Sequence, residues 1–480
     1  MSTPAASAAS ADPFQALDDS KISRFQLKIM FVSGMGFFTD AYDLFVIGIV
    51  VALIETQWKL STHQVSWLNS ATLLASAVGA IIFGRVADIL GRKRIYGYEV
   101  LILAAGAIAS AFAPNYTFLL VCRIILGIGI GGDYPVSATI MSEYSSKSSR
   151  GKMVGLVFSM QAAGLVVGPL IASILLASGI STNLTWRLLL GFGAIPGLAV
   201  YYLRRQIHET PRFAMAGGAH EEAAAAIADA TGASSGVAPK GESTARNQQS
   251  ALDGYMKIFR NRRILIWLIG TAGAWLLLDF CYYGNTISQP EILKALNPHA
   301  SLLHNTLVQL AIVSVFAVPG YIVAVLLMDR TGRKSIQMLG FFMMALMFLI
   351  IGLVTAVTHH VWWFLLLYGI SYFFTEFGPN MTTFIYPAEL FPTDVRTTSH
   401  GISAGAGKLG AFAGAFLFPD FLAVTHGLNR AMTIAGIVAL VGLLLTLATL
   451  PETRGKSLEQ LEEEAYAEVP VTARAGVQPA

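Results

Sequence analysis

The chain has few charged residues: only 13% of its 480 residues are Asp, Glu, Lys or Arg, whereas 54% are hydrophobic. Soluble globular proteins carry roughly 25% charged residues. This shortage of charge excludes an ordinary soluble domain and favours a protein of the lipid bilayer. The net charge of +3 is also too small to suggest binding to nucleic acid.

Cysteine is scarce as well. Cys122 and Cys281 are the two cysteines of the chain, and both lie inside apolar runs. They are too few for a disulfide framework, so we expect them to be structural. The nine histidines show no ligand spacing, and we expect neither a metal site nor another cofactor. The sequence lacks the G-x-x-x-x-G-K-[ST] loop of nucleotide hydrolases, which argues against an ATP-driven protein.

About twelve apolar segments are each long enough to cross a bilayer, which takes roughly 20 helical residues. Their approximate spans are 25–54, 63–86, 95–113, 117–142, 153–178, 186–204, 263–286, 304–328, 335–357, 361–386, 400–424 and 430–450. Basic residues such as Arg92, Lys93 and Arg94 gather in the loops of one side, and the positive-inside rule then predicts cytoplasmic termini. We expect a multi-pass protein of the cell membrane (plasma or inner membrane) that contacts lipid and is a monomer.

The two halves of the sequence repeat. GRVADILGRKR from Gly84 matches VLLMDRTGRKS from Val325, and Gly91 and Gly332 lie 241 positions apart. Offsets of similar size relate three further pairs: Glu143 and Glu389, Arg150 and Arg396, and Asp40 and Asp279. These offsets predict two six-helix halves of one ancestral unit, with a substrate site between them near the middle of the membrane.

The predicted fold class is an all-α membrane protein with twelve transmembrane helices in two pseudo-symmetric six-helix bundles. We expect five regions: a cytoplasmic N-terminal tail (1–22), a first bundle (23–204), a cytoplasmic central loop (205–262), a second bundle (263–450) and a cytoplasmic C-terminal tail (451–480). The central loop is rich in Ala, Gly, Ser and charge without a core-forming pattern. This composition is typical of a tether, with room for a short surface helix.

The stretch GIGIGGDYPVSATIMSE, residues 127–143, contains a literal G-x-G-x-x-G but is not expected to bind a dinucleotide. A dinucleotide loop follows a strand, and its acidic residue lies about 20 positions further on. Here the glycines lie inside an apolar span and Asp133 follows at once. The glycines instead allow close helix packing, and Pro135 is expected to kink the helix. Asp133 then lies in a polar spot at membrane depth, where the alternative role is helix packing alone.

Two acids, Asp40 and Asp43, lie deep in the first apolar segment, within GFFTDAYDLF. A charged side chain there costs about 2.5 kcal/mol or more, and burial favours the neutral form of a carboxyl. A carboxyl poised between two protonation states is what a proton-coupled carrier needs. Asp40 is favoured because its repeat partner, Asp279, is also acidic. The alternative is a structural acid bonded to the backbone or to a lysine.

Trp275, Asp279 and Tyr283 are spaced i, i+4 and i+8, so one helix face carries an indole, a carboxyl and a phenol over about 12 Å. If Asp279 is protonated, all three can donate hydrogen bonds to an anion; if it is ionised, it repels one. One residue can therefore couple proton loading to anion binding. Lys408 lies in a helix of small residues, and its ammonium must pair with an acid, a carbonyl or a bound anion.

Charged residues near the cytoplasmic ends of the helices form two repeat-related sets. The first set is Asp88, Arg92, Glu143 and Arg150, and the second is Asp329, Arg333, Glu389 and Arg396. Charge pairs of this kind hold one face of a carrier shut and part when that face opens. We therefore expect both sets to act as a gate.

The chain resembles the transporters of the major facilitator superfamily. The motif G-x-x-x-D-x-x-G-R-K-R from Gly84 is the hallmark of that superfamily, and ETPRF (209–213) and PETRGKSLEQ (451–460) are similar to signatures of its sugar porters. Within the superfamily, GGDYPVSATIMSE (131–143) resembles the signature of the phosphate:proton symporters. The resemblance implies a set of substrate contacts: Tyr134, Gln161, Trp275, Asp279, Tyr283 and Asn380, with Lys408 counted among them.

The expected function is secondary transport and not enzyme catalysis. Inorganic phosphate would be imported with protons by alternating access, and the expected proton-coupling residues are Asp40, Asp43, Asp133 and Asp279. Two alternatives stay open. The same fold could carry an organic anion, such as an aromatic acid or a dicarboxylate, or a sugar. The chain could also be a nutrient sensor that binds but barely transports.

Overall fold

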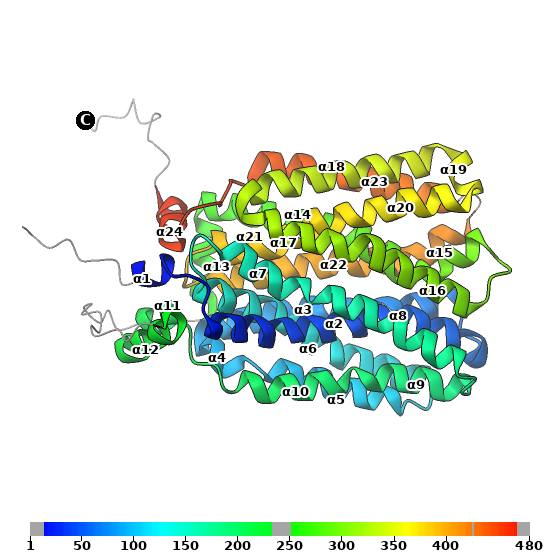
Figure 1. Ribbon diagram of the computed structural model, residues 1–480, viewed down its shortest axis with the longest axis horizontal. Coiled ribbons are helices and arrows are strands. Elements are labelled where there is room, and N and C mark those ends of the chain that lie inside the picture. The colour runs from blue at the N-terminus through cyan, green and yellow to red at the C-terminus, as the bar shows by residue number, and fades with distance from the viewer. Residues whose placement is uncertain (1–13, 233–250, 425–426, 468–480) are drawn as a thin grey trace, which may run out of the picture.

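The structure, a computed structural model, describes residues 14–232, 251–424 and 427–467. Within these ranges every regular element is a helix. Figure 1 shows the long helices running side by side in one elongated bundle. Eleven of the described helices are long and apolar enough to cross a membrane. A twelfth path is interrupted, so the predicted all-α fold with twelve membrane passages is confirmed, with one passage broken.

The first half of the chain contributes six passages. They are α2 (Arg24–Trp58); α3 (Thr62–Leu90); α4 and α5 (Arg92–Ile95 and Tyr98–Ala111); α6 (Tyr116–Tyr144); α7 and α8 (Arg150–Ser159 and Gln161–Ala177); and α9 and α10 (Thr182–Phe192 and Ala194–Arg204). The start of α2 is fixed by a capping box, in which Ser23 and Gln26 satisfy each other's free amide groups.

The second half contributes the other six passages. They are α14 (Arg262–Ile287); α16, η1 and α17 (Leu302–Ile312, Val313–Ala317 and Val318–Thr331); α18 (Arg333–Leu353); α20, η2 and α21 (Val361–Thr375, Glu376–Asn380 and Met381–Leu390); α22 (Arg396–Ala423); and α23 (Gly427–Thr449). Both halves therefore contain six passages, but the continuous and interrupted helices follow a different order in each half.

The passage predicted over 361–386 is the one that is not among the eleven continuous candidate spans. Pro379 has no amide hydrogen, and the backbone of Gly378 leaves the helical region at φ −101° and ψ −110°. The neighbouring α18 approaches so closely that a Cβ on Gly340 would lie 2.3 Å from the Cδ of Pro379. Non-helical backbone is tolerated at membrane depth where protein buries it. The break leaves Glu376 and Asn380 buried inside the bundle.

Five short helices gather at one end of the bundle (Figure 1). They are α1 (Gln15–Asp18), α11 (Pro211–Ala216), α12 (His220–Thr231), α13 (Ala251–Arg260) and α24 (Leu458–Tyr466). We call this end the terminal face; the opposite face carries α15 (Gln289–Leu296) and α19 (Thr355–His359). The predicted tether thus includes three short helices. Of the predicted tails and tether, residues 1–13, 233–250 and 468–480 lie outside the described residues.

The two halves touch at both ends of the bundle. Toward the terminal face α3 lies against α22, and a Cβ on Gly84 would lie 2.7 Å from the carbonyl oxygen of Thr397. Toward the opposite face α2 lies against α14, and a Cβ on Gly48 would lie 2.4 Å from the carbonyl oxygen of Ile287. Glycine is needed at both positions because any side chain would push the halves apart. Residues of the centre, such as Lys408 and Asp279, are buried between these contacts.

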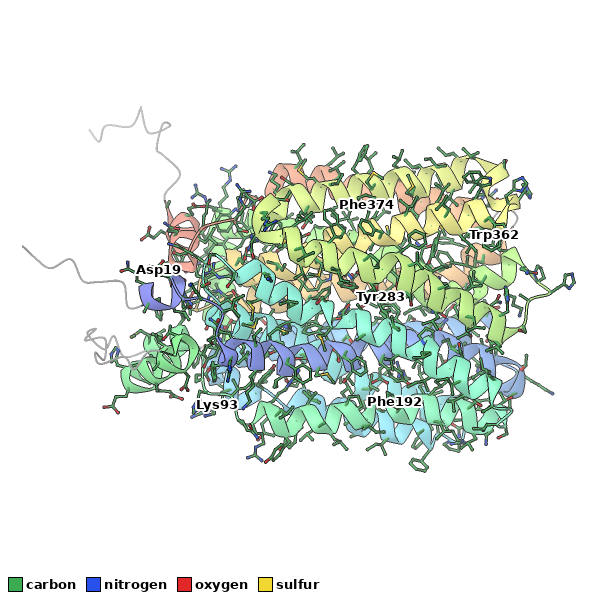
Figure 2. The ribbon with its side chains drawn as sticks, in the orientation of Figure 1. Asp19, Lys93, Phe192, Tyr283, Trp362 and Phe374 are labelled. Atoms are coloured by element: carbon green, nitrogen blue, oxygen red, sulfur yellow. The ribbon has the colours of Figure 1, made fainter. Side chains whose placement is uncertain are left out.

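The outer surface of the bundle is apolar. Large side chains such as Val315, Leu326 and Leu444 are more than half exposed, at 61%, 59% and 56%. A soluble protein rarely exposes so large an apolar surface, whereas a bilayer covers it. Figure 2 shows labelled polar residues such as Asp19 and Lys93 toward the terminal face. The protein is therefore an integral, multi-pass membrane protein.

Candidate substrate and proton site

The centre of the bundle holds one buried lysine between the two halves. The Lys408 ammonium, on α22, donates hydrogen bonds to the hydroxyl of Tyr134 at 3.1 Å and to that of Tyr283 at 2.7 Å. The Asp279 carboxylate lies 3.6 Å from the same ammonium. Tyr134 belongs to the first half, and the other three residues belong to the second. One cation thus joins both halves at the expected position of the substrate.

The predicted stripe on α14 faces this lysine. Trp275, Asp279 and Tyr283 are all buried. The Trp275 indole interacts with the Asp279 carboxyl, and its ring centroid lies 6.0 Å from that of Tyr134. An aromatic stripe alone commonly serves packing, but here the Asp279 carboxyl in the middle of the stripe lies next to the Lys408 ammonium. The stripe therefore joins the central polar network.

The two predicted amides extend the network away from the lysine. Gln161 Nε2 donates to the Tyr134 hydroxyl at 3.1 Å, and the Tyr321 hydroxyl donates to Gln161 Oε1 at 3.3 Å. Asn380 Nδ2 donates to the Tyr321 hydroxyl at 3.0 Å and also bonds the Glu376 carboxylate. All seven predicted substrate residues therefore belong to one connected network.

Sequence reasoning missed Tyr321 as a member of this network. Tyr321 connects Gln161 of the first half to Asn380 of the second. It follows Pro319 and Gly320 in an apolar span, and no spacing in the sequence marks it. Glu376 lies four positions before Asn380, which is the signal that places the two side chains on one helix face.

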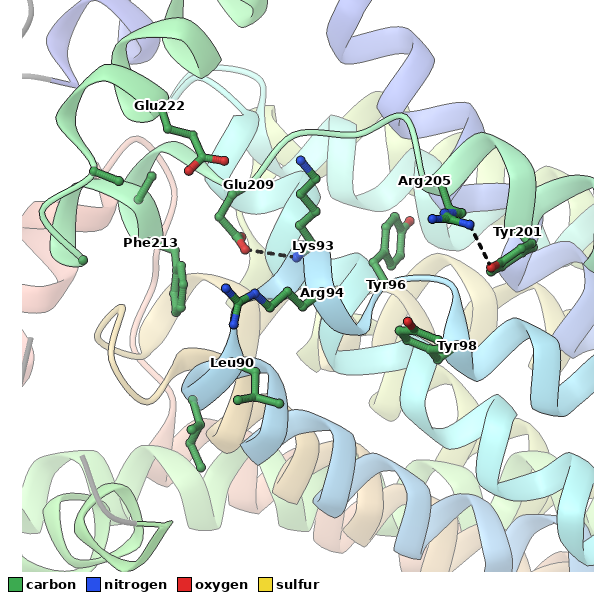
Figure 3. Close-up of a pocket in the computed structure, with 14 residues that line it drawn as sticks. Leu90, Lys93, Arg94, Tyr96, Tyr98, Tyr201, Arg205, Glu209, Phe213 and Glu222 are labelled. Atoms are coloured by element: carbon green, nitrogen blue, oxygen red, sulfur yellow. Dashed lines mark hydrogen bonds between the residues drawn. The ribbon is translucent and has the colours of Figure 1, made fainter. Parts of the chain in front are cut away.

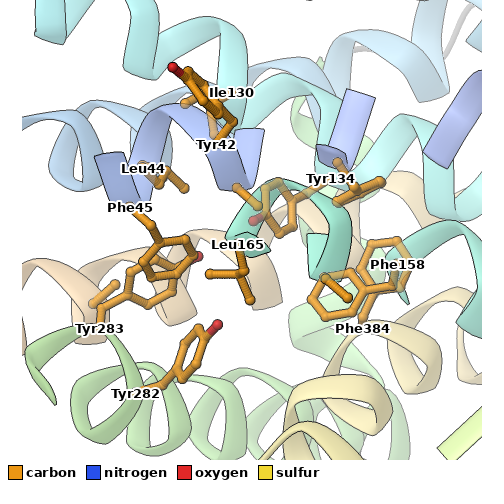
Figure 4. Close-up of a cluster of buried hydrophobic side chains, with 14 of the residues drawn as sticks. Tyr42, Leu44, Phe45, Ile130, Tyr134, Phe158, Leu165, Tyr282, Tyr283 and Phe384 are labelled. Atoms are coloured by element: carbon orange, nitrogen blue, oxygen red, sulfur yellow. The ribbon is translucent and has the colours of Figure 1, made fainter. Parts of the chain in front are cut away.

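Aromatic rings lie around Tyr134 and Tyr283, the two tyrosines bonded to Lys408 (Figure 4). Phe45 stacks on Tyr283, with ring centroids 5.3 Å apart and an interplanar angle of 11°. On the other side Phe158 stacks on Phe384 at 4.5 Å, and Phe384 also lies near Tyr134. Such an enclosure excludes water, and charges and hydrogen-bond donors act more strongly in the low dielectric that results. The hydrogen-bond donors of the network are therefore buried among aromatic rings.

Asp40 lies beside this network without a hydrogen-bond partner. Both of its carboxylate oxygens are buried and unbonded among the residues that the structure describes. The charged groups that act on it most strongly are Asp133, Arg204 and Lys408. Burial without a hydrogen bond is costly for an ionised carboxylate and much less so for a protonated one. The position therefore suits an acid that gains and loses a proton.

Asp133 faces the inside of the first half. Its carboxylate accepts a hydrogen bond from Ser137 at 2.5 Å and pairs with Arg204 at 2.8 Å. Arg204 also pairs with Glu99 at 2.7 Å. Sequence reasoning missed Arg204 and Glu99. The signal was available, because a buried acid needs a cation and Arg204 ends the apolar span predicted over 186–204.

Asp43 faces a different arginine. The Arg123 guanidinium lies 4.0 Å from the Asp43 carboxylate and donates to the Asp43 backbone carbonyl at 2.9 Å. A Cβ on Gly193, at the junction of α9 and α10, would lie 2.6 Å from the same carboxylate. The four predicted proton-coupling acids therefore have different surroundings. Asp279 pairs with the central lysine, Asp43 and Asp133 pair with arginines of the first half, and the carboxylate of Asp40 is not hydrogen-bonded by any described residue.

The first predicted gate set reaches across to the second half. Glu143 pairs with Arg396 at 2.8 Å and with Arg92 at 3.4 Å, and Arg92 also pairs with Asp88 at 3.0 Å. These side chains are fully buried. Asp88 accepts hydrogen bonds from the backbone amide and the hydroxyl of Thr398, at 2.6 and 2.7 Å. The first set thus holds the halves together at the terminal face.

In the second gate set, the ion pairs of Arg333 lie within its own half, whereas Arg396 pairs with Glu143 of the first half. Arg333 pairs with Glu389 at 2.7 Å and with Asp329 at 3.0 Å. Asp329 makes one contact across the halves, since it accepts the backbone amide of Lys152 at 2.8 Å. Arg150 donates to the carbonyl of Lys456 at 3.1 Å and pairs with Asp18 at 3.6 Å. All eight predicted gate residues therefore lie in charge networks near the terminal face.

Two acids that sequence reasoning left out anchor these sets. Glu209 accepts the backbone amides of Arg92 and Lys93, both at 3.2 Å. Glu452 accepts those of Arg333 and Lys334, at 3.0 and 3.1 Å. Each acid opens an E-T dipeptide within ETPRF or PETRGKS. Their matched place in the two halves is the signal that could have found them.

Two six-helix halves around a buried polar network, with one end closed by charge pairs, define a membrane transporter. Comparison with known proteins gives the family. The family described as "Sugar (and other) transporter" matches residues 29–465. The chain therefore belongs to this family of transporters, which lies within the major facilitator superfamily.

Curated proteins similar to this chain include inorganic phosphate transporters of plants. A probable inorganic phosphate transporter 1-6 of Arabidopsis thaliana is 36% identical, over 94% of this chain and 96% of its own length. Inorganic phosphate transporter 1-6 of Oryza sativa subsp. japonica is 35% identical over 94% and 95%. Among solved structures, the proton:xylose symporter XylE superimposes with a TM-score of 0.74 at 20% identity, over 92% and 99% of the two chains. This last likeness supports the fold alone.

Proposed function

We propose that this protein imports inorganic phosphate together with protons by alternating access. The relatives that match nearly the whole chain are named inorganic phosphate transporters. The observation that carries the proposal is the Lys408 ammonium, which is bonded to two tyrosine hydroxyls and lies beside the Asp279 carboxylate. A cation in a water-poor, aromatic enclosure attracts an oxyanion, and the neighbouring donors fix its orientation.

Phosphate would take its hydrogen bonds from residues of both halves. Lys408, Tyr134 and Tyr283 supply the central donors, and the Trp275 indole lies next to them. The amides of Gln161 and Asn380 supply further donors from the connected network. Because donors of both halves would contact one anion, binding draws the halves together, as alternating access requires.

Asp279 would couple the proton to the anion. While Asp279 is ionised, it pairs with Lys408 and repels a phosphate oxygen. When a proton binds Asp279, the lysine charge becomes available to the anion, and the carboxyl can donate a hydrogen bond. Proton and phosphate therefore enter the site together, and loss of the proton restores the pair between Asp279 and Lys408.

The remaining acids would carry protons to and from this site. Asp40 is under the influence of the charges of both Lys408 and Asp133, and Asp133 in turn pairs with Arg204. Protonation of Asp133 would weaken its pair with Arg204, so a proton could pass between Asp40 and the interior of the first half. Asp43 has the same relation to Arg123. The roles of all three acids are part of the proposal.

The terminal face would be the cytoplasmic one in the cell membrane. Loops on this face carry the basic clusters around Arg92 and Arg333, as the positive-inside rule requires. The two gate sets would close this face while phosphate binds from outside and separate to release it. Residues 23–204 and 263–450 would rock as two units joined by the segment 205–262. One chain contains the complete site, so the protein would work as a monomer.

Uptake of labelled phosphate into proteoliposomes tests the proposal. We expect the wild-type protein to concentrate phosphate when an inward proton gradient is imposed. Asp279→Asn should abolish this concentration, because an amide can neither pair with Lys408 as a charge nor exchange a proton. The matched control is Asp420→Asn, an exposed acid at the other end of the Lys408 helix, which should keep wild-type uptake. Gradient-driven uptake by Asp279→Asn would overturn the assignment, and uptake of a sugar or an organic acid instead of phosphate would replace the cargo.

A further inference from the structure

A second polar cavity lies at the terminal face, away from the central site (Figure 3). Its volume is about 830 Å³. The end of α3, the short helix α4 and the start of α5 form one wall, and α10, α11 and α12 form the other. The cavity thus opens between membrane-crossing helices and the surface helices of this face. None of the predicted substrate, proton or gate residues lines it.

Three cations with exposed side chains line this cavity. They are Lys93 and Arg94 on α4 and Arg205 at the end of α10. Arg205 touches the Tyr201 hydroxyl at 3.5 Å, whereas the side chains of Lys93 and Arg94 make no ion pair within the described part of the chain. Figure 3 shows Lys93 and Arg94 between Glu209 and Phe213 on one side and Tyr201 and Arg205 on the other.

The acids of the cavity do not neutralise these cations. Glu209 is buried, and its carboxylate already accepts the backbone amides of Arg92 and Lys93 at 3.2 Å. Burial raises the pKa of Glu209 and the charge of Arg92 lowers it in part. The other lining acid is Glu222, which is exposed on α12. Three basic and two acidic side chains therefore line the cavity, which gives it an excess of positive charge.

An apolar wall adjoins the cations. Ile89, Leu90 and Tyr98 are exposed by 39%, 47% and 60% and line the same cavity. Leu90 ends the membrane-crossing helix α3, so this wall continues onto the surface that the bilayer covers. A soluble anion gains nothing from such a wall, whereas an acyl chain buries apolar area there, at roughly 25 cal/mol per Å². The combination favours an amphiphile over a free ion.

The geometry points to a binding site for an anionic phospholipid in this cavity. The headgroup phosphate would lie among Lys93, Arg94 and Arg205, and the first part of an acyl chain would run along Leu90 and Tyr98. Basic pockets between transmembrane helices on the cytoplasmic side commonly take phosphate-bearing headgroups. Because Glu209 ties α4 to α11 through the amides of Arg92 and Lys93, the bound lipid would brace the part of the gate that holds Arg92.

Native mass spectrometry of the detergent-solubilised protein, titrated with phosphatidylglycerol or phosphatidylcholine, tests this site. Removing three cations with Lys93→Gln, Arg94→Gln and Arg205→Gln should weaken phosphatidylglycerol binding by about tenfold or more. The matched control removes three exposed cations of the same face that lie outside the cavity, with Lys152→Gln, Arg260→Gln and Arg262→Gln. We expect the control to weaken binding by less than about twofold. Thermal unfolding of each variant checks that it is folded.

Two further arms decide the source of the phosphate group. Tyr98→Ala removes part of the apolar wall and should weaken phosphatidylglycerol binding while all three cations remain. Soluble glycerol phosphate should fail to displace the lipid at comparable concentrations. Equal losses in the cavity variant and the control would overturn the proposal in favour of diffuse surface charge. Displacement by glycerol phosphate would overturn it in favour of a site for a soluble phosphate compound.

Discussion

The two gate sets descend from the same repeat but are connected differently. In the first half, Glu143 pairs with Arg396 of the other half, and Asp88 accepts hydrogen bonds from Thr398. In the second half, Glu389 pairs with Arg333 of its own half and accepts a hydrogen bond from Thr453 at 2.5 Å. Repeated motifs therefore supply similar charges, but the ion pair of Glu143 crosses the interface, whereas that of Glu389 lies within its own half and Glu389 acts on Arg150 across the interface through its charge alone.

The same difference appears in the signatures that follow each half. Arg212 of the first signature pairs with Glu459 at 2.8 Å and with Asp18 at 3.5 Å, so it ties the middle of the chain to both ends. Arg454 of the second signature bonds the carbonyl of Arg330, within its own half. Arg212 thus joins separate parts of the terminal face, whereas Arg454 acts within the second half.

Removal of Glu143 should have the largest effect on this face. Glu143→Gln leaves Arg396 buried without its acid, and breaking a buried pair costs about 3–5 kcal/mol. Glu389→Gln should cost less, because Arg333 keeps Asp329. The readout is the labelling rate of a cysteine at Ser142, a buried residue between the halves, by a maleimide, after Cys122 and Cys281 are replaced.

The labelling rates should separate the two variants. We expect Glu143→Gln to raise the rate by about tenfold or more and Glu389→Gln by much less, since each 1.4 kcal/mol is about tenfold in an equilibrium constant. Equal acceleration by both substitutions would mean that the two sets share the lock, and the comparison would fail.

A double-mutant cycle should give the next largest effect. For Glu143→Gln and Arg396→Gln we expect a coupling of about 1–3 kcal/mol in the opening free energy from the same labelling rates. For the repeat-related pair, Glu389→Gln and Arg150→Gln, we expect a smaller coupling of about 0.5–1 kcal/mol, because the charge of Glu389 acts on Arg150 without a direct ion pair. A large coupling in the second cycle would show that Arg150 serves Glu389 during opening.

The smallest effect concerns the pair of Arg212 and Glu459, outside the membrane-crossing helices. Burial disfavours the Glu459 carboxylate, but the charge and hydrogen bond of Arg212 outweigh burial and lower the Glu459 pKa from 4.5 to about 2. The pair therefore stabilises the protein above about pH 4.5, and this stability is lost as the pH falls from 4.5 toward 2. Partial exposure of Glu459 limits the gain to about 1–2 kcal/mol.

Thermal unfolding in detergent at several pH values measures this contribution. Glu459→Gln should unfold at a lower temperature than the wild type at pH 7, and the two curves should converge as the pH approaches 2. The control Glu463→Gln removes an exposed acid of the same helix and should follow the wild type. A Glu459→Gln deficit that stays constant with pH would contradict the role of the ion pair.

Much of the fold and the core of the site follow from the sequence for physical reasons. Apolar runs of about 20 residues have few alternatives to membrane helices. The i, i+4, i+8 spacing places Trp275, Asp279 and Tyr283 on one face whatever the neighbours are. A lysine in an apolar helix must find an acid or an anion, and Lys408 lies beside Asp279.

Other features depend on how the halves pack, which the sequence does not display. Tyr321 joins the network only because α17 brings its hydroxyl between Gln161 and Asn380. The repeat relates Glu143 to Glu389, but it does not reveal that Glu143 pairs with Arg396 across the halves whereas Glu389 pairs with Arg333 of its own half. The break before Pro379 needs the close approach of α18, which is a tertiary contact.

The reverse coupling of phosphate to protons tests the central claim most directly. Proteoliposomes that hold a pH-sensitive dye would be kept at one acidic pH on both sides, at which phosphate is almost entirely the dihydrogen anion and its own dissociation releases almost no protons. They would then be given an inward phosphate gradient, with their membrane potential clamped. The account predicts that phosphate moving down its gradient acidifies the lumen through the wild-type protein and the Asp420→Asn control, and fails to do so through Asp279→Asn. Phosphate influx through the wild-type protein with no proton movement would contradict the account.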